Sequence, residues 1–219
     1  MDATTIQRAA VHAALGEPVR LAIVDDLAVS DRSPKELGDR LGLPTNLLAH
    51  HLDVLAEVGL IERFVSAGDR RRRYVRLVGD PIAGVAPAPL TPPRRVVFVC
   101  THNSARSQLA AALWRDRIGG AAESAGTHPA ERVHPGAVAA AGRAGLDITG
   151  ARPAPLRRLR PTDLVVTVCD RAHEELEPAP GWWHWSTPDP VEAGTSAAFD
   201  AVVTDLDARI RALGPGVAR

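Results

Sequence analysis

The stretch VVFVCTHNSARSQLAAALWRDRIG, residues 96–119, decides how the second half of this chain is expected to fold. It opens with a continuous apolar run that predicts a buried strand ending at Cys100. A small polar loop follows, and from Arg106 onward the alanine- and leucine-rich letters predict a helix. N–H groups in such a loop have no strand partner, so they can face inward and bind an anion beside the positive end of the helix. The stretch therefore predicts an oxyanion site with a cysteine at its base.

The residue types in this loop indicate the chemistry of the site. The inward N–H groups and the helix end both favour the thiolate of Cys100, which is the nucleophilic form. Arg106 offers a planar fork for two oxygens of a tetrahedral anion, and Ser107 can donate a hydrogen bond to the sulfur. Asn103 tolerates the left-handed backbone conformation that the loop needs. The alternative is a buried cysteine followed by an unrelated exposed arginine. The other residues expected to surround the anion are Thr101, His102, Ser104 and Ala105.

Strand-like and helix-like segments continue to alternate after this stretch. Three more strands are expected, at residues 122–126, 164–169 and 182–187. Helices are expected at residues 105–119, 133–146, 171–177 and 196–214. This order predicts an α/β fold with a four-stranded parallel sheet and helices on both faces. Ligands bind at the carboxyl edge of such sheets, so Cys169 and Asp189 should lie close to Cys100.

The part before residue 80 has a helical pattern that ends in a hairpin. Helices are expected at residues 4–15 and 17–29, from Ser33–Pro34 to near Leu41, and from a cap at Thr45 to Val58. Residues 60–67 and 70–78 read as two strands joined by the turn Gly68–Asp69. Short helices followed by a hairpin predict a winged helix-turn-helix domain.

A proline-rich segment separates the two halves. Residues 81–93, PIAGVAPAPLTPP, carry five prolines and no charge, so they suit neither a helix interior nor a central strand. We expect an extended linker there. The predicted domains are therefore a winged helix-turn-helix domain over residues 1–80 and a catalytic domain over residues 94–219.

Composition limits the classes of protein that need to be considered. The chain has 26 basic and 26 acidic residues among its 219, which argues against wholesale adhesion to nucleic acid or membrane but not against a local basic patch. No apolar stretch approaches the roughly 20 residues needed to span a bilayer, and MDATTIQRAA lacks the pattern of a signal peptide. Two cysteines are too few for a disulfide scaffold or a four-cysteine zinc site. We expect a cytoplasmic protein without a metal site or a tightly bound cofactor.

The letters AHHLDVLAEVGLIERF, at the end of the predicted helix-turn-helix, resemble the ArsR-type family of repressors. The resemblance covers about residues 5–80 and implies operator DNA as partner and a homodimer. The helix from Thr45 would enter the major groove with Asn46, His50 and His51 as polar candidates. Arginines of the wing would lie along phosphates, although they could instead form a solvated face that serves protein contacts. These wing arginines are Arg70, Arg71, Arg72 and Arg73.

The letters CTHNSARSQLA resemble the low-molecular-weight tyrosine phosphatase superfamily, and Thr-x-Asn-Ser-x-Arg-Ser-Gln is similar to its arsenate reductase branch. The resemblance covers about residues 94–213. HWSTPDP, residues 184–190, resembles the aspartate–proline loop of the superfamily and implies that Asp189 is a general acid. The alternative is an exposed turn aspartate between two prolines. His102 stands where glycine is frequent, and no role for it follows from the sequence.

The same resemblance bears on how the cysteine would be recycled. Arsenate reductases that use thioredoxin have a second cysteine at the position of Cys169 and a third seven residues later, where this chain has Leu176. Cys169 could still act as a resolving thiol, or it could be a buried structural residue. VCDRAHEEL resembles reductases that use mycothiol, which implies a low-molecular-weight, mycothiol-like thiol as co-substrate and allows a glutaredoxin-like recycling partner.

Three hypotheses follow from the two halves together. The leading one is a thiol-dependent arsenate reductase fused to an ArsR-type regulator, with arsenate or a phosphate-type oxyanion as ligand. The second is a low-molecular-weight protein tyrosine phosphatase, although Val191–Glu192 follow Asp189–Pro190 where that family usually has tyrosines. The third is a regulator whose second domain senses oxyanions without turnover.

Overall fold

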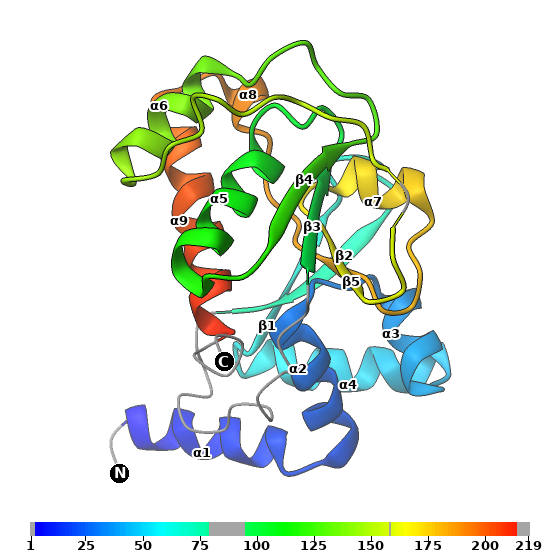
Figure 1. Cartoon of the computed structure of the whole chain (residues 1–219). Helices are drawn as coiled ribbons and strands as arrows, with labels where there is room; N and C mark the ends of the chain where they lie inside the picture. The colour runs from blue at the N-terminus through cyan, green and yellow to red at the C-terminus, as the bar shows by residue number, and fades with distance from the viewer. Residues whose placement is uncertain (1–2, 79–94, 158, 214–219) are drawn as a thin grey trace. The chain divides into compact units, whose positions relative to one another are not determined.

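The computed structural model describes residues 3–78, 95–157 and 159–213, which fall into two compact units (Figure 1). The predicted linker at 81–93 lies outside the described residues. The N-terminal unit consists of α1 (Ala3–Leu15), α2 (Pro18–Val29), α3 (Pro34–Leu41), α4 (Thr45–Glu57), β1 (Ile61–Val65) and β2 (Arg73–Leu77). β1 and β2 pair antiparallel, with Ile61 opposite Leu77. Helices followed by a hairpin confirm the predicted winged helix-turn-helix fold.

Local sequence signals set the turn between α3 and α4. Ser33 caps α3 and forms the predicted capping box with Glu36. Gly42 ends α3 in the left-handed conformation, with φ of 65°. The prediction that Thr45 caps α4 is wrong: Pro44 occupies the cap position without a side-chain hydrogen bond, and Thr45 is the first helical residue.

The hairpin has a longer loop than the sequence suggested. β1 ends at Val65 and β2 begins at Arg73, and the Ser66 N–H donates to the Arg72 carbonyl at 3.0 Å. The predicted two-residue turn at Gly68–Asp69 is therefore wrong. Arg70, Arg71 and Arg72 belong to the loop, so their side chains do not alternate between two faces as they would in a strand.

The C-terminal unit is built on one parallel sheet in the order β4-β3-β5-β6. Its strands are β3 (Arg95–Cys100), β4 (Ala122–Gly126), β5 (Asp163–Thr167) and β6 (Trp183–His184). Its helices are α5 (Arg106–Ile118), α6 (Pro135–Arg143), α7 (Asp170–Leu176), α8 (Pro190–Ala193) and α9 (Ser196–Ala212). The four-stranded parallel α/β fold is thus confirmed.

Alternate residues of β3 are buried on opposite faces of the sheet. Phe98 packs with α5, α6 and α9, and its ring lies 5.9 Å from that of Trp114 and 5.7 Å from that of Trp185. Val97 and Val99 pack on the other face with Leu176. Figure 1 shows α7, the helix of Leu176, on the opposite side of β3 from α5. Burial on both faces explains why the strand is continuously apolar, and ligands of such sheets bind at the carboxyl edge.

Two strands end earlier than predicted. β5 stops at Thr167, so Cys169 is not a strand residue but the N-cap of α7. β6 has only two residues rather than the predicted 182–187. Beyond it, Ser186 and Thr187 are buried as polar residues, and Pro188 cannot donate a ladder hydrogen bond. No helix among the described residues has the length and apolar character required to cross a membrane.

Candidate active site

The cysteine loop joins the end of β3 to the start of α5. Cys100 is the last residue of β3 and lies opposite Gly126 of β4. Ala105 caps α5 without a side-chain hydrogen bond, so the first N–H groups of the helix keep their capacity to bind an anion. Cys100 is 2% exposed and Arg106 is 8% exposed.

Hydrogen bonds from outside the loop fix the direction of its peptides. Every carbonyl from Cys100 to Ala105 accepts a hydrogen bond: the donors are, in order, the N–H groups of Thr127, His128 and Ala130, the Gln108 side-chain amide, and the N–H groups of His134 and Leu109. Because a trans peptide directs its N–H opposite to its carbonyl, the next residues' N–H groups turn toward the inside of the loop. The Asn103 N–H does so visibly, since it donates to the Cys100 sulfur at 3.2 Å.

A chain of hydrogen bonds makes the sulfur an acceptor. The Ala154 N–H donates to Asn103 Oδ1 at 2.8 Å, which assigns the other end of that amide as the donor. Asn103 Nδ2 then donates to Ser107 Oγ at 2.8 Å. The hydroxyl of Ser107 lies 3.0 Å from the Cys100 sulfur and is free to donate its own proton there. Asn103 has φ of 49°, the left-handed conformation expected for it. Two donors on one sulfur are the contacts that a thiolate needs.

Arg106 closes the loop by binding the segment that carries Asp189, residues 184–190, which we call the acid segment. Its Nη2 lies 2.6 Å from Asp189 Oδ2, and its Nη1 donates to the Thr187 carbonyl at 3.0 Å. Asp189 also caps α8 by accepting from the Val191 N–H at 2.9 Å. A bound tetrahedral anion would compete with Asp189 for the guanidinium, so binding of the anion and release of the carboxylate are linked.

Cys169 lies beside the cysteine loop as a buried thiol. Its sulfur is 3.4 Å from Thr101 Oγ1 and accepts from the Ala172 N–H at 3.5 Å. Burial raises the pKa of Cys169, and the nearby Cys100 raises it further, against the opposing effects of Arg106, Thr101 and Ala172. The structure therefore brings both cysteines to one edge of the sheet but favours the neutral form of Cys169.

Sequence reasoning missed a buried polar cluster behind the acid segment. His184 Nε2 lies 3.1 Å from Asp170 Oδ1, and its Nδ1 lies 2.9 Å from Thr167 Oγ1. Burial alone would raise the pKa of Asp170, but hydrogen bonds from His184 and Ser186 outweigh it and hold the pKa below its ordinary value. Asp170, expected beside Cys169 at the edge of the sheet, and the histidine in HWSTPDP were the signals for this cluster, which joins the start of α7 to the segment leading to Asp189.

The DNA candidates of the N-terminal unit divide into exposed and buried residues. Asn46 and His50 are exposed on α4, and residues 70–73 are exposed on the hairpin. The prediction that His51 contacts DNA is wrong, because it is only 6% exposed. It shares a helix face with the buried Leu48, three residues earlier, and Leu55, four residues later, and this places it in the core.

His102 is exposed while Thr101 is buried, so the histidine lies at the surface of the loop. Among the described residues, no group of three or more histidine, cysteine, aspartate or glutamate side chains is arranged to bind a metal ion.

Comparison with known proteins identifies the class of this fold and site. Residues 95–219, more than half of the chain, match the low molecular weight phosphotyrosine protein phosphatase family, and the chain belongs to that family. Residues 15–63 match a helix-turn-helix domain, which confirms the resemblance at the N-terminus.

Individual relatives refine this assignment. The chain is 34% identical over 126 residues to an arsenate reductase of Brevibacillus brevis, covering 54% of this chain and 92% of the relative. It is also 34% identical over 125 residues to arsenate reductase 1 of Bacillus cereus, covering 54% and 92%. A tyrosine phosphatase of Erwinia amylovora shares the fold, with a TM-score of 0.50 and 18% identity over 57% of this chain and 94% of that one.

Proposed function

We propose that the C-terminal domain is a thiol-dependent arsenate reductase that acts in the cytoplasm as part of an ArsR-type DNA-binding regulator. The observation that carries the proposal is the sulfur of Cys100, which receives hydrogen bonds from Asn103 and Ser107 inside a loop whose N–H groups face inward. The identity to arsenate reductases along nearly their whole length supports this choice of substrate.

The first half-reaction forms a bond between sulfur and arsenic. The Cys100 thiolate attacks arsenate while the loop N–H groups and Arg106 bind its oxygens. Arg106 exchanges the carboxylate of Asp189 for two of those oxygens. Asp189 must then carry a proton, which it gives to the departing oxygen so that water rather than hydroxide leaves.

The second half-reaction transfers two electrons. A second thiol attacks the Cys100 sulfur, a disulfide forms, and the electron pair of the broken sulfur–arsenic bond stays with arsenic, which leaves as arsenite. Burial of Cys169 favours a low-molecular-weight, mycothiol-like thiol in this role, with a glutaredoxin-like protein to reduce the mixed disulfide. Cys169 remains the intramolecular alternative, since it lies against Thr101.

A thiol-coupled assay tests the proposal. The full chain is supplied with arsenate and, separately, with several small thiols, and arsenite is measured. Cys100→Ser should abolish turnover with every thiol, while Cys169→Ala should retain it if the external thiol resolves the intermediate. Mass spectrometry after arsenate exposure separates a Cys100 adduct from a Cys100–Cys169 disulfide. Absence of arsenite with every thiol, together with fast hydrolysis of an aryl phosphate, would overturn the proposal.

Phosphatase activity is the second candidate, favoured by the position of Asp189 at the anion site. The pairing of Asp189 with Arg106 supports an acid beside the oxygens of a bound oxyanion, as phosphate ester cleavage requires. Hydrolysis of an aryl phosphate that is lost in Cys100→Ser would establish it.

For the N-terminal domain we propose operator DNA as partner of a homodimer. Its support is the exposed set on α4 and the hairpin: Asn46, His50 and Arg70, Arg71, Arg72 and Arg73. Fluorescence anisotropy with selected duplexes should show affinity that falls steeply with salt, and each wing arginine changed to glutamine should lower the logarithmic salt slope by about one. If arsenate changes the affinity of the Cys100→Ser variant for operator DNA, the oxyanion-sensing alternative is favoured.

A further inference from the structure

We propose that Gln108 is a positioning residue that holds Asn103, and through it the Cys100 thiolate and the inward N–H groups. The inference deepens the proposed function and rests on it. Gln108 is the third residue of α5 and is 4% exposed, and its amide binds Asn103 and Arg152 rather than the Cys100 sulfur.

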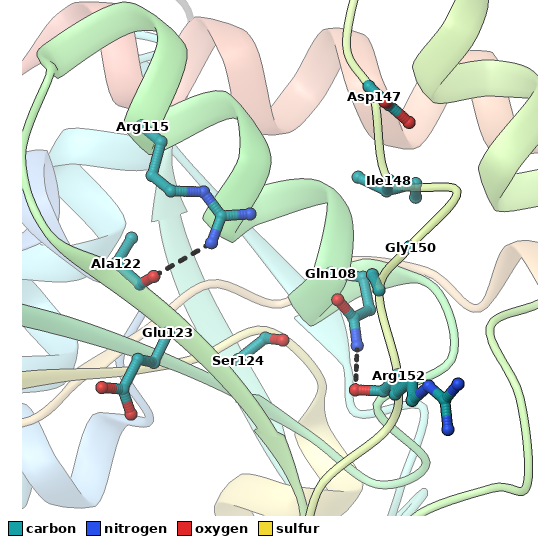
Figure 2. A pocket seen from close by; sticks show the side chains of 10 residues that line it. Gln108, Arg115, Ala122, Glu123, Ser124, Asp147, Ile148, Gly150 and Arg152 are labelled. Carbon is teal, nitrogen blue, oxygen red and sulfur yellow. Dashed lines mark hydrogen bonds between the residues drawn. The ribbon is translucent and has the colours of Figure 1, made fainter.

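One nitrogen of Gln108 joins three separate acceptors. Its Nε2 lies 3.2 Å from the Asn103 carbonyl, 3.1 Å from Asn103 Oδ1 and 3.2 Å from the Arg152 carbonyl. A primary amide has two hydrogens, so both are used and two of the three acceptors share one of them. Figure 2 shows the bond to Arg152 at the side of a cavity of about 500 Å³. The helix, the cysteine loop and the segment around residue 152 therefore meet at this nitrogen.

The bond to the Asn103 carbonyl fixes the direction of one loop peptide. All other loop carbonyls accept from N–H groups of the main chain, but this one accepts from a side chain. Because the peptide is planar, holding this carbonyl outward turns the Ser104 N–H inward. A non-glycine residue is strained in the left-handed conformation, so Asn103 needs contacts of this kind to stay there.

The bond to Asn103 Oδ1 fixes the direction of the proton chain. Gln108 and the Ala154 N–H both donate to this oxygen, so the side-chain amide cannot reverse without placing donors against donors. Its Nδ2 must then donate to Ser107, and the Ser107 hydroxyl is left to donate to Cys100. Without Gln108 both the loop peptide and the side chain of Asn103 lose a restraint.

Gln108→Met tests the role, with Arg115→Met as its matched control. Both changes replace a long polar side chain on α5 that lines the same cavity (Figure 2). The guanidinium of Arg115 donates to the Ala122 carbonyl and not to the cysteine loop. Rates of Cys100 alkylation by iodoacetamide are measured in the full chain from pH 5 to pH 9, and peptide mass spectrometry separates Cys100 from Cys169. Protection from alkylation by phosphate and by arsenate is measured in parallel.

The two variants should differ in both readouts. Gln108→Met should move the pH–rate profile toward alkaline pH by about half to one unit and weaken protection by about tenfold, as expected for one or two lost hydrogen bonds. Arg115→Met should match the wild type in both. Gln108→Glu, which keeps the size of the side chain but turns acceptors toward acceptors, should weaken protection at least as much as Gln108→Met.

Each other outcome has a definite meaning. A lower thermal unfolding midpoint with an unchanged profile and unchanged protection would show that Gln108 only packs, and would overturn the inference. Equal shifts in the Gln108 and Arg115 variants would overturn it as well. If phosphate and arsenate fail to protect Cys100 in the wild type, the proposed function itself fails, whatever the variants do.

Discussion

Gly126→Ala should damage the active site without touching a catalytic side chain. Gly126 ends β4 directly beneath the cysteine loop. A Cβ built there would lie 2.7 Å from the Thr101 carbonyl oxygen and 3.0 Å from the Asn103 nitrogen. Ordinary contact begins near 3.4 Å, so the loop or the strand must move by roughly 0.7 Å. Both neighbours are main-chain atoms, which cannot rotate away as a side chain would.

The expected loss is larger for activity than for stability. Overpacking of this kind typically costs about 1–3 kcal/mol in the free energy of unfolding. Displacement of reacting groups by about 1 Å can cost ~100-fold in rate, so a shift of this size should lower kcat/KM for arsenate by about 10- to 100-fold. Urea unfolding and the thiol-coupled assay measure the two quantities on one preparation.

Gly142→Ala is the matched control. Gly142 is an exposed residue of α6, and a Cβ there meets nothing within 4 Å. The same chemical change should stabilise the protein by about 0.5–1 kcal/mol, because alanine is the better helix former, and activity should be unchanged. The reasoning is refuted if Gly126→Ala is as active and as stable as the wild type.

Three further changes have defined outcomes. Asp189→Asn removes the acid and releases Arg106, so turnover should fall by about 100-fold or more while phosphate binds as well as before or better; weaker binding would contradict the pairing seen here. The lowered pKa of Asp170 means that its ionised form stabilises the fold above about pH 4 and that this stability is lost as pH falls through the folded-state pKa. Asp170→Asn should therefore be less stable at pH 7, and its free energy of unfolding in urea should fall less than that of the wild type as the pH is lowered. An equally steep fall in both proteins would count against the ion pair. Because burial raises the pKa of Cys169, iodoacetamide at neutral pH should label Cys100 several-fold faster, and equal labelling would contradict that burial.

Features that depend on residues close together in the chain were predictable from the sequence. The capping box of Ser33 and Glu36, the strand ending at Cys100 and the helix beginning near Arg106 are all encoded within a few residues. The parallel sheet followed from continuous apolar runs separated by helices, whereas the order of its strands did not. Each of these signals acts through propensity or capping, so no distant contact was needed to read it.

Features set by distant contacts were not predictable. His51 looked polar and available, but the helix face it shares with leucines buries it. β6 ends at His184, and the contacts that follow it are distant in sequence: Ser186 bonds to Asp170, and the Thr187 carbonyl accepts from Arg106. Gln108 gave no local signal, because its acceptors include the carbonyl of a residue 44 positions away. A single sequence shows which residues can donate a hydrogen bond, but not where the acceptors will lie.

The outward carbonyls of the cysteine loop have a consequence for how this protein can diversify. A cradle made of main-chain groups does not depend on the identity of most side chains along it, so His102, which faces solvent, and Ser104 can change while the anion keeps its contacts. Saturation mutagenesis at those two positions should therefore yield many variants that differ in which oxyanion ester or thiol they accept but still bind inorganic phosphate. The side chains of the loop can therefore alter which substrate is accepted, while its main-chain N–H groups continue to bind the anion.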